Sequence, residues 1–197
     1  RFLEYVKINT QSCEDSDTFP STPGQLDLQR KLFDELTALG LDDVVLDEHG
    51  YVFATVPATS DKDNVPVIGF LAHVDTSPEI SGEGVKAIFH RDYQGQDIVL
   101  PDDPGQVIRF NKHPELAKQI GNDIVTASGL TLLGADDKAG LAEIMDAANH
   151  LMKNPDIKHG KIRILFTPDE EIGRGVDKAD ITNVIHYEMS DSLESYA

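Results

Sequence analysis

The chain has 197 residues, enough for a domain with a substantial hydrophobic core, and its share of charged side chains is ordinary for a globular protein. It carries 35 acidic and 17 basic side chains, which gives a formal net charge of −18. Nucleic acids and anionic membranes bind basic surfaces, so we expect neither as a partner. No segment has the apolar length of a membrane span, and the single cysteine, Cys13, excludes an intrachain disulfide and fits a cytoplasmic location.

The first part of the chain predicts two helices and then three strands. The first helix, over residues 1–9, is short and amphipathic. The second has an apolar stripe between two boundary signals. Ser21 or Thr22 is placed as its N-cap with Pro23 in the first turn, and Gly40 follows its last residue. The three strands are expected at residues 44–46, 51–56 and 65–73.

The most apolar run in the chain extends from Val65 to Ala72. An apolar run without alternation is typical of a strand that is buried on both faces, as in a parallel sheet. The run ends in His73-Val-Asp75, and side chains two positions apart on a strand share a face, so Asp75 can orient the ring of His73. In open α/β sheets ligands bind beyond the carboxyl ends of the strands, so this pair is expected at a functional site.

The remainder of the chain begins with weakly patterned residues, 76–122, and then returns to clear periodicity. Helices alternate with apolar strands, so the expected fold class is α/β, with a mixed, largely parallel sheet flanked by helices. The remaining expected elements are short strands at 98–100 and 107–110, a hairpin of 124–127 with 131–133, a helix at 138–154, a buried strand at 161–166 and a candidate last strand at 181–187.

Three polar clusters share one context, because each follows an apolar strand or opens a helix. They are His73 with Asp75, Asp136 with Asp137, and Glu170 with Glu171. One imidazole with several carboxylates is a ligand set suited to zinc, cobalt or manganese, and a carboxylate that bridges two cations would relieve the repulsion among the acids. Neighbouring glutamates face different ways, so one can bind metal while the other takes a proton from bound water.

Each cluster, taken singly, has a simpler structural explanation. A histidine and an aspartate at a strand end are commonly a surface turn, and two glutamates are commonly solvated. Two aspartates before a helix are commonly an N-cap. Lys138 could pair with either of them and is expected to be structural. The shared placement after buried strands favours a metal site. The other histidines lack this context and are expected to be surface or core residues.

The same residues carry a resemblance to a known family. HVDTSP (73–78), LLGADDKAG (132–140) and FTPDEE (166–171) look like the motifs of the peptidase T branch, the tripeptide aminopeptidases, of a dizinc metallopeptidase family. That family also includes carboxypeptidase G and acetylornithine deacetylase. The similarity runs from Phe2 to about Asp180 and implies a dizinc exopeptidase-like catalytic domain.

The resemblance implies a role for each candidate residue. His73 would bind one metal ion and Asp75 would orient it, Asp136 would bridge two ions, Glu171 would be a further ligand, and Glu170 would be the general base. The implied cofactor is two zinc ions in the intact enzyme, with cobalt or manganese as alternatives. The implied reaction is release of the N-terminal residue from a short peptide, with metal-bound hydroxide attacking the peptide carbonyl.

The resemblance also implies domain boundaries and an incomplete site. Residues 1–180 would be the N-terminal segment of the catalytic domain, and residues 181–197 a divergent tail. In the family a lid domain interrupts the catalytic domain, which then resumes and supplies the last metal-binding histidine, so we expect this chain alone to be inactive. Asp191 lies near the place of the second metal's aspartate, although its sequence setting differs. The bond between Asp136 and Asp137 would be cis, and a homodimer would form through the lid domain.

Two alternatives stay open. A related dizinc deacetylase, dipeptidase or carboxypeptidase could use the same half-site, because specificity groups would lie largely in the lid domain. The chain could instead be a truncated, non-catalytic homologue that only binds a cation. In either case, sheet strands that are missing from the chain would leave apolar surface exposed and favour association.

Overall fold

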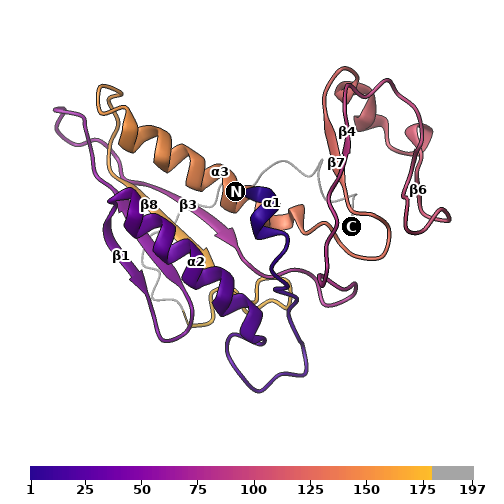
Figure 1. Cartoon of the computed structure of the whole chain (residues 1–197). Coiled ribbons are helices and arrows are strands. Elements are labelled where there is room, and N and C mark those ends of the chain that lie inside the picture. Colours follow the sequence, from indigo (N-terminus) through magenta and orange to yellow (C-terminus); the bar gives the residue numbers. More distant parts are fainter. Residues whose placement is uncertain (179–197) are drawn as a thin grey trace.

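A four-stranded mixed sheet forms the main part of the molecule, for which a computed structural model describes residues 1–178 (Figure 1). The strand order is β1-β2-β8-β3, with antiparallel pairing of β1 to β2 and of β2 to β8, and parallel pairing of β8 to β3. The predicted mixed sheet flanked by helices is confirmed. Its parallel share is smaller than predicted, because the short turn after β1 makes an antiparallel hairpin. The strands are β1 (Asp42–Leu46), β2 (Val52–Val56), β3 (Ile68–His73) and β8 (Ile162–Thr167).

Two long helices pack against this sheet, α2 (Pro23–Leu39) and α3 (Ala135–Lys153), and a short one, α1 (Phe2–Tyr5), contacts α3. The predicted end of α2 is confirmed, since Gly40 adopts a left-handed conformation with φ of 77°. Thr22 occupies the N-cap position but makes no side-chain bond to a helix amide, because its hydroxyl donates to the carbonyl of Gln11. None of the helices in the described part has the length and apolarity for crossing a membrane.

The hydrophobic core lies between the helices and one face of the sheet. Alternate residues of β2 and β8 point into it, as expected for pleated strands. Leu28, Leu32 and Leu36 of α2 are completely buried in this core. Full burial of each leucine contributes roughly 1.5–3 kcal/mol, so this stripe is sufficient to hold α2 on the sheet.

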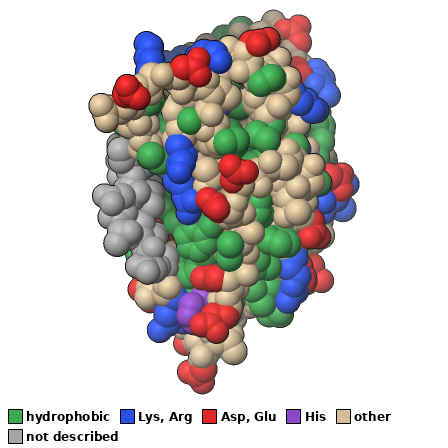
Figure 2. Space-filling view, turned by 90° about the vertical axis from the view of Figure 1, so that its left-hand side faces the viewer, with side chains coloured by type: hydrophobic (Ala, Val, Ile, Leu, Met, Phe, Trp, Pro, Cys, Tyr) green, Lys and Arg blue, Asp and Glu red, His purple; other side chains and the backbone are tan. Residues whose placement is uncertain are grey.

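The edge strand β3 is less covered than the sequence predicted. Among the described residues it pairs with β8 alone, and Val67 and Ile68 at its start are 50% and 42% exposed. The prediction of burial on both faces is therefore wrong for its first half, because no described strand covers its outer edge. Ala72 and His73, at the other end, are buried. Figure 2 shows hydrophobic side chains reaching the surface between charged ones.

A second small lobe, within residues 88–126, lies beside the main sheet (Figure 1). Its own core consists of Tyr93, Ile98 and Leu116. The predicted hairpin of residues 124–127 with 131–133 is wrong: β7 pairs with the three-residue β4, which is too short to show periodicity. The lobe contains β4 (Ile88–His90), β5 (Ile98–Val99), β6 (Val107–Ile108), η1 (Phe110–Lys112), η2 (Pro114–Gln119) and β7 (Ile124–Thr126).

Candidate metal centre

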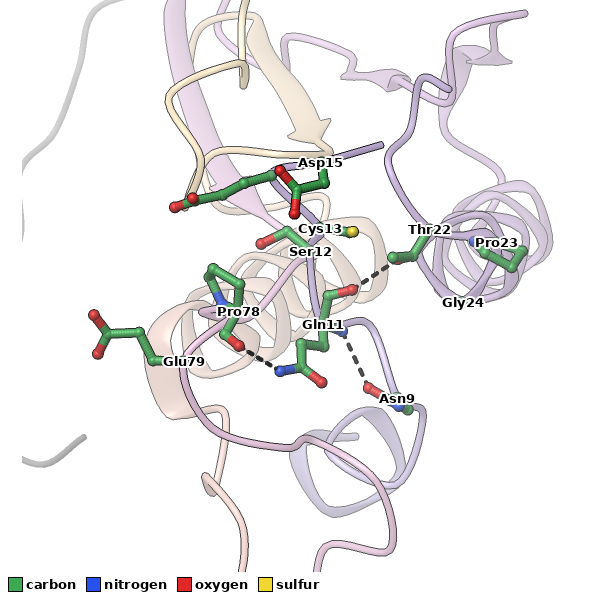
Figure 3. Close-up of a pocket in the computed structure, with 11 residues that line it drawn as sticks. Asn9, Gln11, Ser12, Cys13, Asp15, Thr22, Pro23, Gly24, Pro78 and Glu79 are labelled. Carbon is green, nitrogen blue, oxygen red and sulfur yellow. Dashed lines mark hydrogen bonds between the residues drawn. The ribbon is translucent and has the colours of Figure 1, made fainter. Parts of the chain in front are cut away.

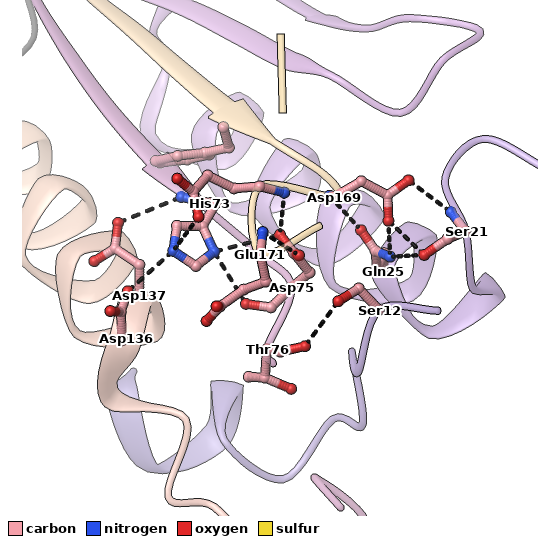
Figure 4. A network of polar contacts seen from close by, with 12 residues as sticks. Ser12, Ser21, Gln25, His73, Asp75, Thr76, Asp136, Asp137, Asp169 and Glu171 are labelled. Carbon is pink, nitrogen blue, oxygen red and sulfur yellow. Dashed lines mark hydrogen bonds and ion pairs between the residues drawn. The ribbon is translucent and has the colours of Figure 1, made fainter. Parts of the chain in front are cut away.

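The three polar clusters meet at the carboxyl ends of β3 and β8 (Figure 4). His73 ends β3, Asp136 lies at the start of α3, and Glu171 follows β8. One ligand atom from each of these three side chains lies within 4.8 Å of the others. The convergence follows from topology, because the carboxyl ends of parallel neighbours lie at the same edge of a sheet.

The imidazole of His73 is held on both sides. Its Nδ1 lies 3.0 Å from the backbone oxygen of Asp75 and 3.3 Å from Oδ1 of the same residue. Its Nε2 lies 3.0 Å from Oδ1 of Asp136 and 3.7 Å from Oε2 of Glu170. Burial lowers the pKa of His73, but hydrogen bonds to Asp136 and Asp75 outweigh burial and place the pKa well above 6.5. Nε2 is therefore the nitrogen that faces the acidic cluster, and Asp75 orients the ring from behind.

Asp75 connects two parts of the site. Its side chain is completely buried, and its two oxygens accept the backbone N–H groups of Glu170 at 2.9 Å and Glu171 at 3.0 Å. The same carboxylate therefore holds the ring of His73 and the backbone that carries Glu170 and Glu171. The sequence indicated only the contact with His73, because strand patterns do not show which side chain accepts the amides of a distant loop.

The two aspartates at the start of α3 point to different partners. The bond between them is cis, as the resemblance implied. Asp136 is turned toward the cluster, and its hydrogen bond with His73 holds the pKa of its carboxyl below the usual range. Asp137 accepts the backbone N–H of His73 at 3.3 Å and that of Gly140 at 3.2 Å. Asp137 therefore caps α3, in agreement with the N-cap interpretation of the sequence, and also links the helix to β3.

Gly140 leaves room for the carboxylate of Asp137. A Cβ at this position would lie 2.3 Å from Oδ1 of Asp137. Alanine is favoured over glycine inside a helix by about 1 kcal/mol. We nevertheless expect Gly140→Ala to lower the free energy of unfolding by about 1–2 kcal/mol, because the carboxylate of Asp137 would lose its amide partners. Chemical denaturation of the single and double variants measures this. In the Asp137→Ala background Gly140→Ala should be neutral or stabilising, and stabilisation in the wild type would contradict the assigned contact.

Lys138 is buried and structural, as expected, but it bonds to neither of the neighbouring aspartates with which it could have paired. Its ammonium group donates to the carbonyl oxygen of Ile8 at 2.8 Å, and its side chain is 1% exposed. Burial lowers its pKa to about 8, while the nearby carboxylate of Asp75 acts in the opposite direction. Lys138 therefore attaches α3 to the segment that follows α1.

The acids of the cluster are difficult to ionise together. Burial raises the pKa of Glu171 to about 7, and repulsion from Asp136, Asp75 and Glu170 adds to this effect. Burial also raises the pKa of Asp137 to about 6. A cation would remove this penalty, and one imidazole nitrogen with carboxylate oxygens within reach is a donor set that zinc accepts. The residues present therefore fit a zinc ion.

These shifts predict how the metal-free chain responds to pH. The folded state keeps a proton on Glu171 up to about pH 7, whereas the ordinary pKa of glutamate is 4.5. The raised pKa of His73 also makes the folded state bind more protons. The folded state then binds more protons than the unfolded state, so stability falls as pH rises through this window. The lowered pKa of Asp136 has the opposite effect on stability but acts in the acid range, below this window. Lys138, with a pKa of about 8, also has the opposite effect, at the upper end of the window.

We expect the melting temperature of the metal-free chain to fall between about pH 5 and about pH 8, with a smaller fall in Glu171→Gln. Thermal unfolding followed by circular dichroism measures both chains. Zinc should bind more tightly as the pH rises toward 7, because Glu171 must be ionised to bind it. An identical pH dependence in the two chains would contradict the raised pKa of Glu171.

A hollow of about 810 Å³ lies beside the loop that precedes α2 (Figure 3). Gln11 crosses it, donating from its side-chain amide to the carbonyl of Pro78 at 2.8 Å and accepting the hydroxyl proton of Thr22 with its own carbonyl. None of the three candidate metal ligands lines this hollow. The hollow is therefore a separate feature from the candidate metal centre.

Sequence reasoning missed one further acid of the site, Asp169, which is completely buried beside the glutamates. Its carboxylate binds Ser21 and Gln25, at the start of α2 (Figure 4). The sequence carries no clear signal for this contact, because three consecutive acids after a strand resemble a solvated turn. Asp191 and the predicted strand 181–187 lie outside the described residues.

Comparisons with known proteins identify the relatives of the chain. No protein-family model matches it. Peptidase T of Geobacillus kaustophilus is 56% identical over 181 residues, which cover 92% of this chain and 44% of that protein. Peptidase T of Bacillus pumilus is 52% identical over the same share of both. This chain is related to peptidase T. It spans less than half the length of these peptidase T relatives.

Solved structures lead to the same relatives. The aminopeptidase PepT from Bacillus cereus ATCC 10987 superposes with a TM-score of 0.59 and 26% identity, over 91% of this chain and 38% of that one. A tripeptidase from Staphylococcus aureus gives the same values. An aminoacylhistidine dipeptidase from Vibrio alginolyticus, at 23% identity and a TM-score of 0.55 over 92% of this chain and 30% of that one, shares the fold. The fold is thus that of peptidase T, of which this chain covers a part.

Proposed function

We propose that the chain is the N-terminal part of the catalytic domain of a zinc-dependent aminopeptidase that releases the N-terminal residue from short peptides, tripeptides above all. The observation that carries the proposal is the convergence of His73, Asp136 and Glu171, with Glu170 beside them. The relatives named peptidase T and the structure described as a tripeptidase support the substrate class. The second zinc ion, the short-peptide partner, the cytoplasmic location and a homodimer through a lid domain belong to the same proposal.

Each residue of the site would have a distinct task. His73, Asp136 and Glu171 would hold the ion, and Asp136 is placed at the open side, where its carboxylate is 69% exposed and can reach a second ion. A bound zinc ion supplies a Lewis acid that polarises the peptide carbonyl and makes water easier to deprotonate. Glu170 would take the proton from the attacking water and pass it to the leaving amine.

The position of Glu170 suits this proton transfer. Its side chain is 54% exposed, and its Oε2 lies 3.7 Å from Nε2 of His73. Its backbone is fixed, because the N–H of Glu170 donates to Asp75. A carboxylate with a fixed backbone and an accessible end can reach a water on one side and a leaving nitrogen on the other. Glu171, held by the same carboxylate of Asp75, is more buried and faces the other candidate ligands.

A chimaera tests whether this segment supports catalysis. Residues 1–178 would replace the matching segment of the Geobacillus kaustophilus peptidase T, which is 56% identical to it. We expect zinc-dependent release of the N-terminal residue from a tripeptide, at a rate within about tenfold of that of the unmodified relative. This range corresponds to an increase in the activation free energy of about 1.4 kcal/mol at most. A folded chimaera that binds zinc without turnover would favour the non-catalytic alternative.

The substrate class needs a separate experiment, because the specificity groups are expected largely in the lid domain. The full-length product of the reading frame that encodes this chain would be assayed on a tripeptide, an N-acetyl amino acid and a C-terminally blocked tripeptide. We expect cleavage of the tripeptide and of the C-terminally blocked tripeptide, because both have a free N-terminus. Preference for the N-acetyl amino acid would favour a deacetylase, and loss of cleavage on blocking the C-terminus alone would favour a carboxypeptidase.

A further inference from the structure

We propose that Asp169 is a positioning residue, which fixes the glutamate turn (residues 168–175) to the start of α2 and thereby sets the places of Glu170 and Glu171 at the metal centre. The inference rests on the proposed function, because it assigns Asp169 a role in metal binding beyond folding. The acid itself touches neither His73 nor any candidate ligand side chain among the contacts of the described residues. Its effect would pass through the backbone of the turn.

The contacts of Asp169 form a closed set at the start of α2 (Figure 4). One oxygen accepts the backbone N–H of Ser21 at 2.8 Å, and the other accepts the hydroxyl of Ser21 and the side-chain amide of Gln25 at 2.6 Å. The backbone N–H of Asp169 donates back to Oε1 of Gln25 at 3.0 Å. Asp169 and Gln25 have no exposed surface, so water does not compete for these bonds.

The charge of Asp169 is balanced by dipoles and not by an ion pair. In the described part of the chain no lysine, arginine or histidine side chain forms an ion pair with its carboxylate. A buried carboxylate is stable when several N–H and O–H groups donate to it, and the start of a 17-residue helix such as α2 adds a favourable dipole. These neutral partners have fixed directions, so they define the orientation of the acid closely.

The backbone at Asp169 carries this orientation into the turn. Its φ is 54°, in the left-handed region that aspartate and asparagine tolerate better than most residues. The turn then closes with bonds from the N–H of Gly173 to the carbonyl of Glu170 and from the N–H of Arg174 to the carbonyl of Asp169. The chain thus reverses direction directly after β8, which returns the glutamates toward His73.

The turn is consequently held from two sides. Asp169 attaches the turn to the start of α2, and Asp75 accepts the N–H groups of the next two residues, Glu170 and Glu171. The fixation has to resist repulsion, since Glu171 lies beside Asp136, Asp75 and Glu170. If the anchor to α2 were lost, the glutamates could move apart by turning about the remaining contact with Asp75.

Three variants of the full 197-residue chain separate positioning from folding. Asp169→Asn keeps the left-handed conformation and nearly the same volume, but turns an N–H₂ group toward donors. Gln25→Leu removes the partner on α2. Gln29→Leu is the matched control, because Gln29 is equally buried on the same helix but donates to the carbonyl of Phe166, outside the turn. Each chain would be measured for thermal stability, zinc affinity by chelator competition, and the visible spectrum of bound cobalt.

Hydrogen exchange of the peptide that covers residues 168–175 is read in the metal-free chains. We expect exchange in this peptide to accelerate in Asp169→Asn and Gln25→Leu, zinc affinity to fall about 10–100-fold, and the cobalt spectrum to change. Gln29→Leu, which removes a bond outside the turn, should leave exchange of this peptide unchanged and zinc affinity within about twofold of the wild type.

The possible results are distinct. Unchanged exchange of the turn in Asp169→Asn overturns the anchor. Faster exchange with unaltered zinc affinity and cobalt spectrum overturns the positioning role, because Asp169 would then serve folding alone. The positioning role is also overturned if zinc affinity falls as much in Gln29→Leu as in Asp169→Asn. A folded wild-type chain that binds neither zinc nor cobalt overturns the proposed function itself, and this result is read before any variant is compared.

Discussion

Glu170→Gln, introduced into the chimaera with the Geobacillus peptidase T, is expected to lower tripeptide cleavage by about 10³-fold while zinc affinity stays within about threefold. Glutamine keeps the size of the side chain and the backbone N–H that donates to Asp75. It cannot accept a proton at neutral pH, so the attacking water would lose its base. The fall should appear in kcat, with KM nearly unchanged, because the side chain acts on the reaction and not on substrate binding.

The matched control for this change is Glu143→Gln, the same replacement on the exposed side of α3. It should leave cleavage and zinc affinity unaltered. Steady-state kinetics and chelator competition on the same preparations give both quantities. Cleavage at the wild-type rate in Glu170→Gln would remove the proton-transfer role, and parallel loss of zinc and activity would make Glu170 a metal ligand instead.

Asp75→Ala should have the widest effect of any single change at the site, because one buried carboxylate serves three partners. It would leave the partly buried N–H groups of Glu170 and Glu171 without their acceptor, and it would remove the carboxylate beside Nδ1 of His73. Each unpaired buried N–H costs about 1–3 kcal/mol, so we expect the free energy of unfolding to fall by about 2–4 kcal/mol.

Zinc affinity should fall about 10–100-fold in Asp75→Ala, since the second partner of a metal-binding imidazole has effects of that size. Urea denaturation and zinc competition measure the two effects. Asp47→Ala is the control, because Asp47 also accepts two backbone N–H groups, those of His49 and Tyr51, but in the turn between β1 and β2. An equal loss of zinc affinity in the control would show that the effect of Asp75 is one of general stability.

Local sequence signals predicted the long elements well. The apolar stripe and Gly40 located α2, and a continuous apolar stripe located α3, whose structure runs over Ala135–Lys153. The short strands were predicted less well. β4 has three residues and pairs with β7 far along the chain, so no periodic pattern marked it, and residues 131–133 were assigned to a hairpin that does not form.

The candidate site was also predictable only in part. The position of His73, Asp136 and Glu171 directly after strands or before a helix was sufficient to predict that they would meet, because parallel strands end at a common edge. Their distances and their partners could not be predicted. A structural role was expected for Lys138, but its partner, the carbonyl of Ile8, belongs to a segment that is far away in the sequence.

The amino-acid sequence by itself determined the α/β class, the long helices and the three polar clusters, because periodicity and capping depend on neighbours along the chain. Only the tertiary structure decided that Asp75 binds the amides of the glutamate turn and that Asp169 attaches this turn to α2. It also decided that the start of β3 is exposed. The physical reason is that hydrogen bonds and burial between distant segments depend on strand order and register, which local patterns do not encode.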